Sequence, residues 1–266
     1  MTTTVVDLPN AWVAVAGGGD TVWCATGERL LAFDETGATR IDVSAPGSVI
    51  QLAATSDVLV AVLGSGVLAW LDPRTGQEVA TRPVGSALEL LSGGGAIWAI
   101  DRLGSRARRL DAPGTLGAAH AVAGIDRAAA DGDRLWWTST GDARLRDLER
   151  VVDIDIPSVA RGGMAACAGS VWVSVRGGLS RVGAWAAQAG PLVAAPAGPV
   201  PFLACAGGVL VGAAERHTVF VLDPSADADA RAIDVDTGAP VAAIATAGRT
   251  LWLFPAGRAE AHVVPL

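Results

Sequence analysis

The stretch Asp131-Gly-Asp-Arg-Leu-Trp136 contains one copy of a phrase that recurs along the whole chain. Each copy places a turn, a small or charged residue and two variable or apolar positions before a Trp or Val. The copies are Asp20-Thr-Val-Trp23, Asp57-Val-Leu-Val60, Gly95-Ala-Ile-Trp98, Asp133-Arg-Leu-Trp136, Gly169-Ser-Val-Trp172, Gly208-Val-Leu-Val211 and Arg249-Thr-Leu-Trp252. Their last positions are 37, 38, 38, 36, 39 and 41 residues apart. This near-constant period predicts seven similar structural units.

Each repeat divides into four short segments that are separated by Gly, Pro and Asp turns. The first segment is rich in alanine, as in Val13–Ala16 and Met164–Ala168, and the second carries the repeated phrase. The third ends in a turn such as Leu71-Asp-Pro-Arg-Thr-Gly76. The fourth alternates apolar and polar residues, as in Arg40-Ile-Asp-Val43. Short alternating segments between turns predict an antiparallel meander of four strands in every repeat.

The predicted fold is therefore all-β, a seven-bladed β-propeller made of four-stranded antiparallel blades. A four-stranded unit that is apolar on both faces cannot bury them alone, whereas radial stacking buries both faces against neighbours. Blades converge toward the axis, so small alanine side chains suit the innermost strand. The tryptophans, one strand further out, are expected to fill the widening space between blades.

The ends of the chain predict how the ring closes. After Trp252 there is room for one more strand, Ala261–Leu266, so the seventh repeat lacks its fourth. Thr4–Leu8 precedes the first alanine-rich segment and resembles a fourth strand. Pairing of this N-terminal strand with the C-terminal hairpin would complete blade seven and remove an open edge. Residues 1–266 are thus expected to form one domain.

Composition limits the classes of partner. The formal charge of −7 argues against nucleic acid, whose phosphates require a clustered basic surface. No run approaches 18 apolar residues, so no membrane span is expected. Met1–Pro9 has neither a basic leader nor an apolar core, which leads us to expect a cytoplasmic location. Cys24, Cys167 and Cys205 are expected to be free, buried thiols in a reducing compartment, although Cys167 and Cys205 fall on neighbouring inner strands at similar register and could approach each other.

The repeat phrases Leu71–Val79 and Asp131–Trp136 resemble those of the YVTN, NHL and quinoprotein-like propellers. Trp136-Trp-Thr-Ser139 and Trp98-Ala-Ile-Asp101 are similar to phrases of the streptogramin (virginiamycin B) lyases, which share the blade count. This resemblance implies a lyase site of histidines and a glutamate around magnesium. The three histidines of this chain show no His-x-Glu arrangement, so we expect no metal. No glycine-rich loop precedes a helix, and no cofactor is expected.

Candidate site residues come from the loops between second and third strands and between fourth and first strands, which form one mouth of a propeller. The predicted ligand-binding residues from these loops are Glu89, Asp101, Arg127, Arg161, Arg176 and Arg258. Arg102, Asp126, Arg216 and Glu260 belong to the same loops. Arginines there could clamp a carboxylate or phosphate. Glu215 and His217 are the candidate catalytic pair, with His217 as a general base that Glu215 orients. A solvated turn is the alternative reading of these two residues.

Two functions fit this pattern. The first is a binding scaffold that recognises a small molecule or partner protein at one mouth, with apolar anchors such as Trp12, Trp70, Trp137 or Trp185 where the pattern does not bury them. The alternative is a cytosolic lyase- or cyclase-type enzyme that acts on a polar or anionic metabolite at the central funnel. His120 and His262 are expected to be surface or satisfied side chains.

Overall fold

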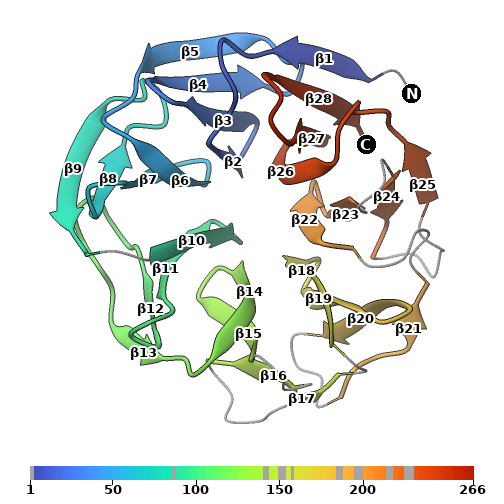
Figure 1. The fold of residues 1–266 in the computed structure, drawn as a ribbon. Helices are drawn as coiled ribbons and strands as arrows, with labels where there is room; N and C mark the ends of the chain where they lie inside the picture. Colours follow the sequence, from blue (N-terminus) through green and yellow to red (C-terminus); the bar gives the residue numbers. More distant parts are fainter. Residues whose placement is uncertain are drawn as a thin grey trace.

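The computed structural model describes residues 3–85, 88–139, 144–148, 154–156, 159–183, 188–194, 200–213, 218–224 and 231–266. The regular elements in these residues are all β-strands, and they form seven four-stranded antiparallel sheets. The sheets stand as blades around an axis, with the first strand of each blade innermost (Figure 1). The prediction of an all-β, seven-bladed propeller is confirmed.

The strands follow the chain from the axis outward in each blade. Blade 1 contains β2 (Ala14–Gly18), β3 (Thr21–Thr26), β4 (Arg29–Asp34) and β5 (Thr39–Ser44), and blade 2 contains β6 (Val49–Ala54), β7 (Leu59–Leu63), β8 (Val67–Leu71) and β9 (Glu78–Pro83). Blade 3 contains β10 (Leu88–Gly93), β11 (Ala96–Asp101), β12 (Arg106–Arg109) and β13 (Ala119–Ala121), and blade 4 contains β14 (Ile125–Asp131), β15 (Arg134–Ser139), β16 (Arg144–Asp147) and β17 (Ile154–Asp155). Blade 5 contains β18 (Val159–Cys167), β19 (Ser170–Val175), β20 (Gly178–Gly183) and β21 (Leu192–Val193), and blade 6 contains β22 (Phe202–Ala206), β23 (Val209–Ala213), β24 (Thr218–Leu222) and β25 (Arg231–Asp234).

Blade 7 is assembled from both ends of the chain. Its inner three strands are β26 (Val241–Ala247), β27 (Thr250–Pro255) and β28 (Glu260–Pro265), and its outermost strand is β1 (Thr4–Asp7). β1 runs antiparallel to β28, with Thr4 opposite Val263 and Asp7 opposite Glu260. The N–H of Leu8 continues this pairing by donating to the carbonyl of Ala259 at 2.9 Å. The two chain ends therefore hold one sheet together.

The core lies between blades. The described buried residues form seven apolar clusters, one at each boundary between consecutive blades. In β3, Val22 and Cys24 pack toward blade 7, whereas Trp23 and Ala25 pack toward blade 2. Successive side chains of a strand point to opposite faces, so every blade supplies apolar groups to both neighbours. This alternation explains why no blade can bury its surface alone.

The tryptophans of the repeat phrase occupy these boundaries, as predicted. All five are at most 2% exposed: Trp23, Trp98, Trp136, Trp172 and Trp252. The indole N–H of Trp98 in blade 3 donates to the carbonyl of Gly132 in blade 4 at 3.1 Å. Tryptophan therefore contributes both apolar area and, at this boundary, a directional link between blades.

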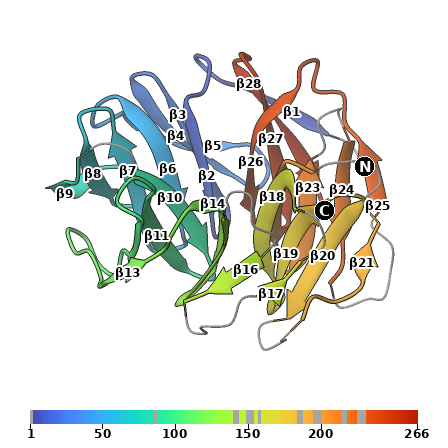
Figure 2. The same ribbon diagram turned by 60° about the horizontal axis from the view of Figure 1, so that its bottom comes forward.

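The strands of each blade run between the two ends of the ring (Figure 2). We call one the hairpin end, where a tight turn joins the first and second strands, and the other the loop end. At the hairpin end the blades nearly touch: a Cβ on Gly17 would overlap the backbone of Thr246, and one on Gly93 would overlap the carbonyl of Ala130. The N–H of Gly248 also donates to the carbonyl of Gly19 at 2.7 Å. Small residues therefore occupy the inner strands where neighbouring blades come closest, as predicted.

Candidate functional site

Three inner strands carry an irregularity at the same place near the loop end. The register of β6, β14 and β26 against the second strand shifts at Ile50, Asp126 and Ala242. Each of these residues lies three positions before the inner-strand residue that pairs with the Trp or Val of the repeat phrase. A β-bulge leaves its extra residue unpaired and re-aims the side chain, and bulges are frequent beside functional sites. The inner strands of these three blades thus share an irregularity at the loop end.

Val13 holds the equivalent position in blade 1. Its N–H donates to the carbonyl of Ala25 at 2.8 Å, although the register partner of Ala25 is Ala14, so two residues of this segment face one residue of β3. Val13 and Ile50 are 48% and 47% exposed, and Ala242 is also exposed. These residues belong to the consecutive blades 7, 1 and 2. We call Val13, Ile50 and Ala242 the apolar arc.

The next part of the loop end, on blades 3 and 4, is charged. Arg102 donates through Nε to Glu89 Oε2 at 2.6 Å, and its Nη1 and Nη2 reach the carbonyls of Ile125 and Asp126 at 2.5 and 3.1 Å. The guanidinium therefore joins the two blades at the bulge of β14. Arg127 follows the bulge and is exposed. The structure brings together Glu89, Arg102 and Asp126 from the predicted set.

The other predicted site residues are distributed around the ring. Asp101 caps its own turn by accepting from the N–H of Gly104 at 2.7 Å. Arg258 donates to the carbonyl of Gly238 at 3.3 Å, and Arg176 is exposed in the turn between β19 and β20. The backbone of Arg161 lies in β18. Glu215, Arg216 and His217 lie outside the described residues.

The tryptophans expected as exposed anchors do not have that role where the structure describes them. Trp70 is 1% exposed and Trp137 is 6% exposed, because both pack between blades. Trp12 is half-buried and donates its indole N–H to the carbonyl of Pro255 at 2.9 Å. Trp185 lies outside the described residues. The exposed apolar side chains at the loop end are aliphatic, and Leu103, between β11 and β12, is 83% exposed.

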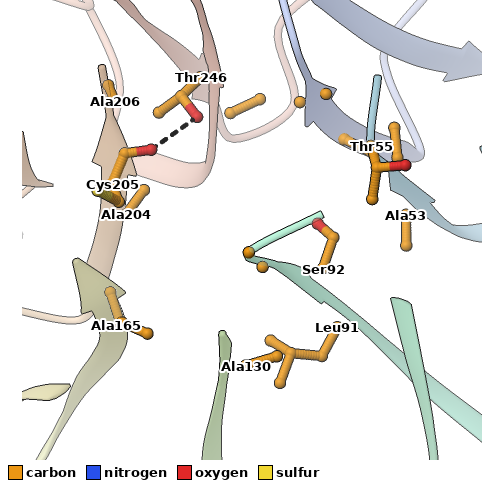
Figure 3. A pocket seen from close by; sticks show the side chains of 18 of the residues that line it. Ala53, Thr55, Leu91, Ser92, Ala130, Ala165, Ala204, Cys205, Ala206 and Thr246 are labelled. Atoms are coloured by element: carbon orange, nitrogen blue, oxygen red, sulfur yellow. Dashed lines mark hydrogen bonds between the residues drawn. The ribbon is translucent and has the colours of Figure 1, made fainter. Parts of the chain in front are cut away.

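A cavity of about 780 Å³ lies on the axis (Figure 3). It extends from the middle of the inner strands to the hairpin end, and small residues such as Ala53, Ser92 and Ala204 line its wall. The only ionisable side chain among its described lining residues, apart from two cysteines, is Asp131. None of the predicted site residues that the structure describes is among the lining residues of this cavity. The cavity and the predicted mouth are therefore at opposite ends of the channel.

Two cysteines in the cavity wall correct the expectation of three free thiols. Cys167 in β18 and Cys205 in β22 form a disulfide, with 5.2 Å between their Cα atoms. Cys24 is free and buried between blades 7 and 1, and burial raises the pKa of its thiol to about 12. The expectation of free thiols rested on a reducing compartment, in which disulfides are rare. The register of β18 and β22, which brings the two cysteines together, was the better guide.

The histidines that the structure describes are separated. His120 is exposed and lies beside Trp98, with 5.8 Å between the ring centroids. His262 is 6% exposed in β28, and its Nε2 lies 3.6 Å from Glu260 Oε1. Within the described ranges, no three His, Cys, Asp or Glu side chains are grouped as a metal site. In the same ranges, no helix has the length and apolar character needed to cross a membrane.

No family model and no curated protein matches this sequence. Solved structures do match it, and two lyase structures match over nearly the whole of both chains. A catalytically inactive virginiamycin B lyase from Staphylococcus aureus, solved with quinupristin, superposes with a TM-score of 0.76 at 14% identity, over 100% of this chain and 99% of the lyase. A streptogramin B lyase gives 0.73 at 14% identity, over 100% and 98%.

A third match has a different role. PorZ, a surface component of the type-IX secretion system of Porphyromonas gingivalis, gives a TM-score of 0.68 at 14% identity, over 95% of this chain and 36% of PorZ. The resemblance to streptogramin lyase-like propellers that the sequence indicates is confirmed for the fold. At these identities the likeness concerns architecture alone, because one fold can carry many functions.

Proposed function

We propose that this chain is a binding scaffold that recognises a partner protein at the loop end of its channel. The observation that supports the proposal is the apolar arc: Val13, Ile50 and Ala242 occupy one repeat position on three consecutive blades, and bulged or doubled register places them there. Their side chains are exposed, although the same strands are otherwise packed against neighbours.

The chemistry of the loop end suits a protein segment. Productive interfaces combine a desolvated apolar centre with a polar rim that fixes orientation. The apolar arc would receive an aliphatic or aromatic side chain of the partner near the axis. Arg127 and the Glu89–Arg102 pair on blades 3 and 4 would supply the rim. Because Arg102 is already held by blade 4, little side-chain entropy would be lost there on binding.

The experiment uses a phage-displayed peptide library selected on the immobilised, folded chain. Fluorescence anisotropy then measures the dissociation constants of the enriched peptides for wild type and for Ile50→Asp. Burying a carboxylate in the apolar arc should weaken binding at least tenfold. Val79→Asp is the matched control, because Val79 is a similarly exposed aliphatic residue, at 57%, on the outermost strand β9. It should bind within twofold of wild type.

Two results would contradict the proposal. One is a set of enriched peptides that bind Ile50→Asp and Val79→Asp equally well, which would place recognition elsewhere. The other is a selection that enriches no peptide with an apolar side chain. Circular dichroism melting of each variant establishes that a loss of binding does not reflect unfolding.

The second candidate function is an acid–base enzyme of the lyase or cyclase type, with His217 as general base and Glu215 as its orienting carboxylate. It is supported by the full-length likeness to the virginiamycin B lyase fold. A thermal-shift screen with magnesium, phosphate and dicarboxylates tests it on wild type and His217→Ala. Stabilisation by one ligand that disappears in the variant would favour the enzyme over the scaffold.

A further inference from the structure

The boundary between blades 5 and 6 differs from the others because a disulfide crosses it. The two blades are separate sheets, so no strand-to-strand ladder joins β18 to β22. The Cys167–Cys205 disulfide joins these strands directly at the channel. The carbonyl of Cys205 also accepts from Thr246 Oγ1 of blade 7 at 3.3 Å (Figure 3). The disulfide is therefore part of a chain of contacts through three blades.

The position of the two cysteines follows from strand alternation. Ala165 pairs with Trp172 and Ala204 with Val211, so these alanines occupy equivalent places in the two repeats. Cys167 lies two residues after Ala165, whereas Cys205 lies one residue after Ala204. An offset of one residue reverses the face to which a strand side chain points. Cys167 therefore faces blade 6 while Cys205 faces blade 5, and both pack in the cluster between these blades.

Both cysteines also line the axial cavity. Cys205 is half-buried, whereas Cys167 is 3% exposed. A volume of about 780 Å³ is sufficient for a small dithiol beside them. The residue after Cys167, Ala168, has a left-handed backbone with φ of 49°, which is unfavourable for a residue with a side chain. Both half-cystines thus border the cavity, and Cys167 adjoins a strained turn.

We infer that Cys167–Cys205 is a reversible redox site, which a small dithiol reaches through the axial cavity and which sets the stability of the blade 5–6 boundary. One thiolate of the dithiol attacks one sulfur, and the S–S bond breaks to give a mixed disulfide and a cysteine thiolate. The second thiol of the reagent then displaces the other cysteine. The chain gains two electrons and two protons, and the dithiol becomes a cyclic disulfide.

The first experiment treats the native chain with dithiothreitol, alkylates it with N-ethylmaleimide and locates the labels by mass spectrometry. Cys167 and Cys205 should become labelled under native conditions, while Cys24 should stay unlabelled because burial raises its pKa to about 12 and excludes the reagent. Labelling of the pair only in denaturant would overturn the proposal. So would labelling of both cysteines before any reductant is added.

Access through the cavity is tested by the size of the reductant. The rate of reduction of the native chain is divided by the rate for the urea-unfolded chain, once with dithiothreitol and once with thioredoxin. We expect this ratio to be at least tenfold lower for thioredoxin, since a folded protein cannot enter the cavity. Equal ratios would show that the disulfide is reached from outside the channel.

The stability of the boundary is tested by melting. Reduction should lower the melting temperature by about 6–12 °C, because a closed loop of 38 residues no longer restricts the unfolded chain. Cys167→Ser combined with Cys205→Ser should show the lower value with or without dithiothreitol. Cys24→Ser should retain the response of wild type. A wild-type melting temperature that does not change on complete reduction would contradict the inference, whatever the double variant does.

Discussion

The hairpin end and the loop end of the channel are formed by the same seven strands, yet they differ in how strictly the repeats agree. At the hairpin end, backbones of neighbouring blades approach so closely at Gly17 and Gly93 that there is no space for a Cβ. At the loop end, bulges turn Ile50, Asp126 and Ala242 away from the regular alternation, and these positions hold two apolar residues and one acid. Packing limits which residues can occupy the hairpin end, whereas the residues at the loop end can differ from blade to blade.

This difference distinguishes the residues that stabilise the ring from the residues that can give this propeller its own binding properties. A residue whose side chain is enclosed by two blades can change only at a cost in stability. A residue on a bulge at the channel opening can change with little effect on folding. Recognition is therefore expected at the loop end, and sensitivity to substitution at the hairpin end.

The largest predicted effect comes from two matched glycines. Gly93→Ala, at the hairpin end, should lower the free energy of unfolding by about 3 kcal/mol, because the obstructing atom is the backbone carbonyl of Ala130 and cannot rotate away. Gly64→Ala, at the loop end, should change it by under about 1 kcal/mol, since the nearest atom to its Cβ would lie 3.5 Å away. Urea denaturation measures both. Equal losses would remove the contrast between the ends.

A smaller effect is predicted for two tryptophans at equivalent positions. Trp98→Phe removes the hydrogen bond to the carbonyl of Gly132, whereas the indole N–H of Trp252 has no partner among the described residues. Both substitutions lose packing volume, but the first should cost about 1 kcal/mol more. Comparison of the two unfolding free energies cancels the shared packing loss. A larger loss in Trp252→Phe would show that the link to the hairpin turn of blade 4 contributes nothing.

The smallest effect is a pH dependence at the turn between β4 and β5. The hydroxyl of Thr36 donates to Asp34 at 2.6 Å, and this bond, joined by backbone N–H groups and Arg40, lowers the carboxyl pKa from 3.8 to about 2. The ionised form is favoured by folding, so its stabilising contribution is complete above pH 3.8 and disappears as the pH falls through 2. Asp34→Asn should therefore lose less stability than wild type between pH 4 and pH 2. Thermal melts in that range measure the difference, and parallel curves would contradict the assignment.

The sequence predicts the parts of this fold that repeat. The period of the Trp or Val phrase determines the number of blades, and the alanine segments identify the inner strands, because both follow from packing that every blade shares. The bulges at Ile50, Asp126 and Ala242 have no common residue type, so no pattern indicates them. The disulfide does leave a signal: Cys167 and Cys205 differ by one place in their repeats, and this offset turns their side chains toward each other.

The site was less predictable than the fold. The order of strands and loops determines at which end residues such as Glu89 and Arg127 lie, and both occupy the first residues of inner strands. Which of them meet depends on how far a side chain reaches across a blade boundary, as Arg102 does to the carbonyl of Ile125. Trp70 and Trp137 are not available as exposed anchors, because both are buried between blades.

The most direct test of the separate roles of the hairpin end in stability and the loop end in recognition measures both properties in the same two variants. Ile50→Asp should melt within about 2 °C of wild type and bind the selected peptides at least tenfold more weakly, because Ile50 is already exposed at the loop end. Gly93→Ala should melt well below wild type, while its folded fraction binds those peptides with unchanged affinity. Unfolding of the ring by Ile50→Asp with no effect on binding would contradict these separate roles of the two ends. Loss of binding by Gly93→Ala in protein that remained folded would contradict them too.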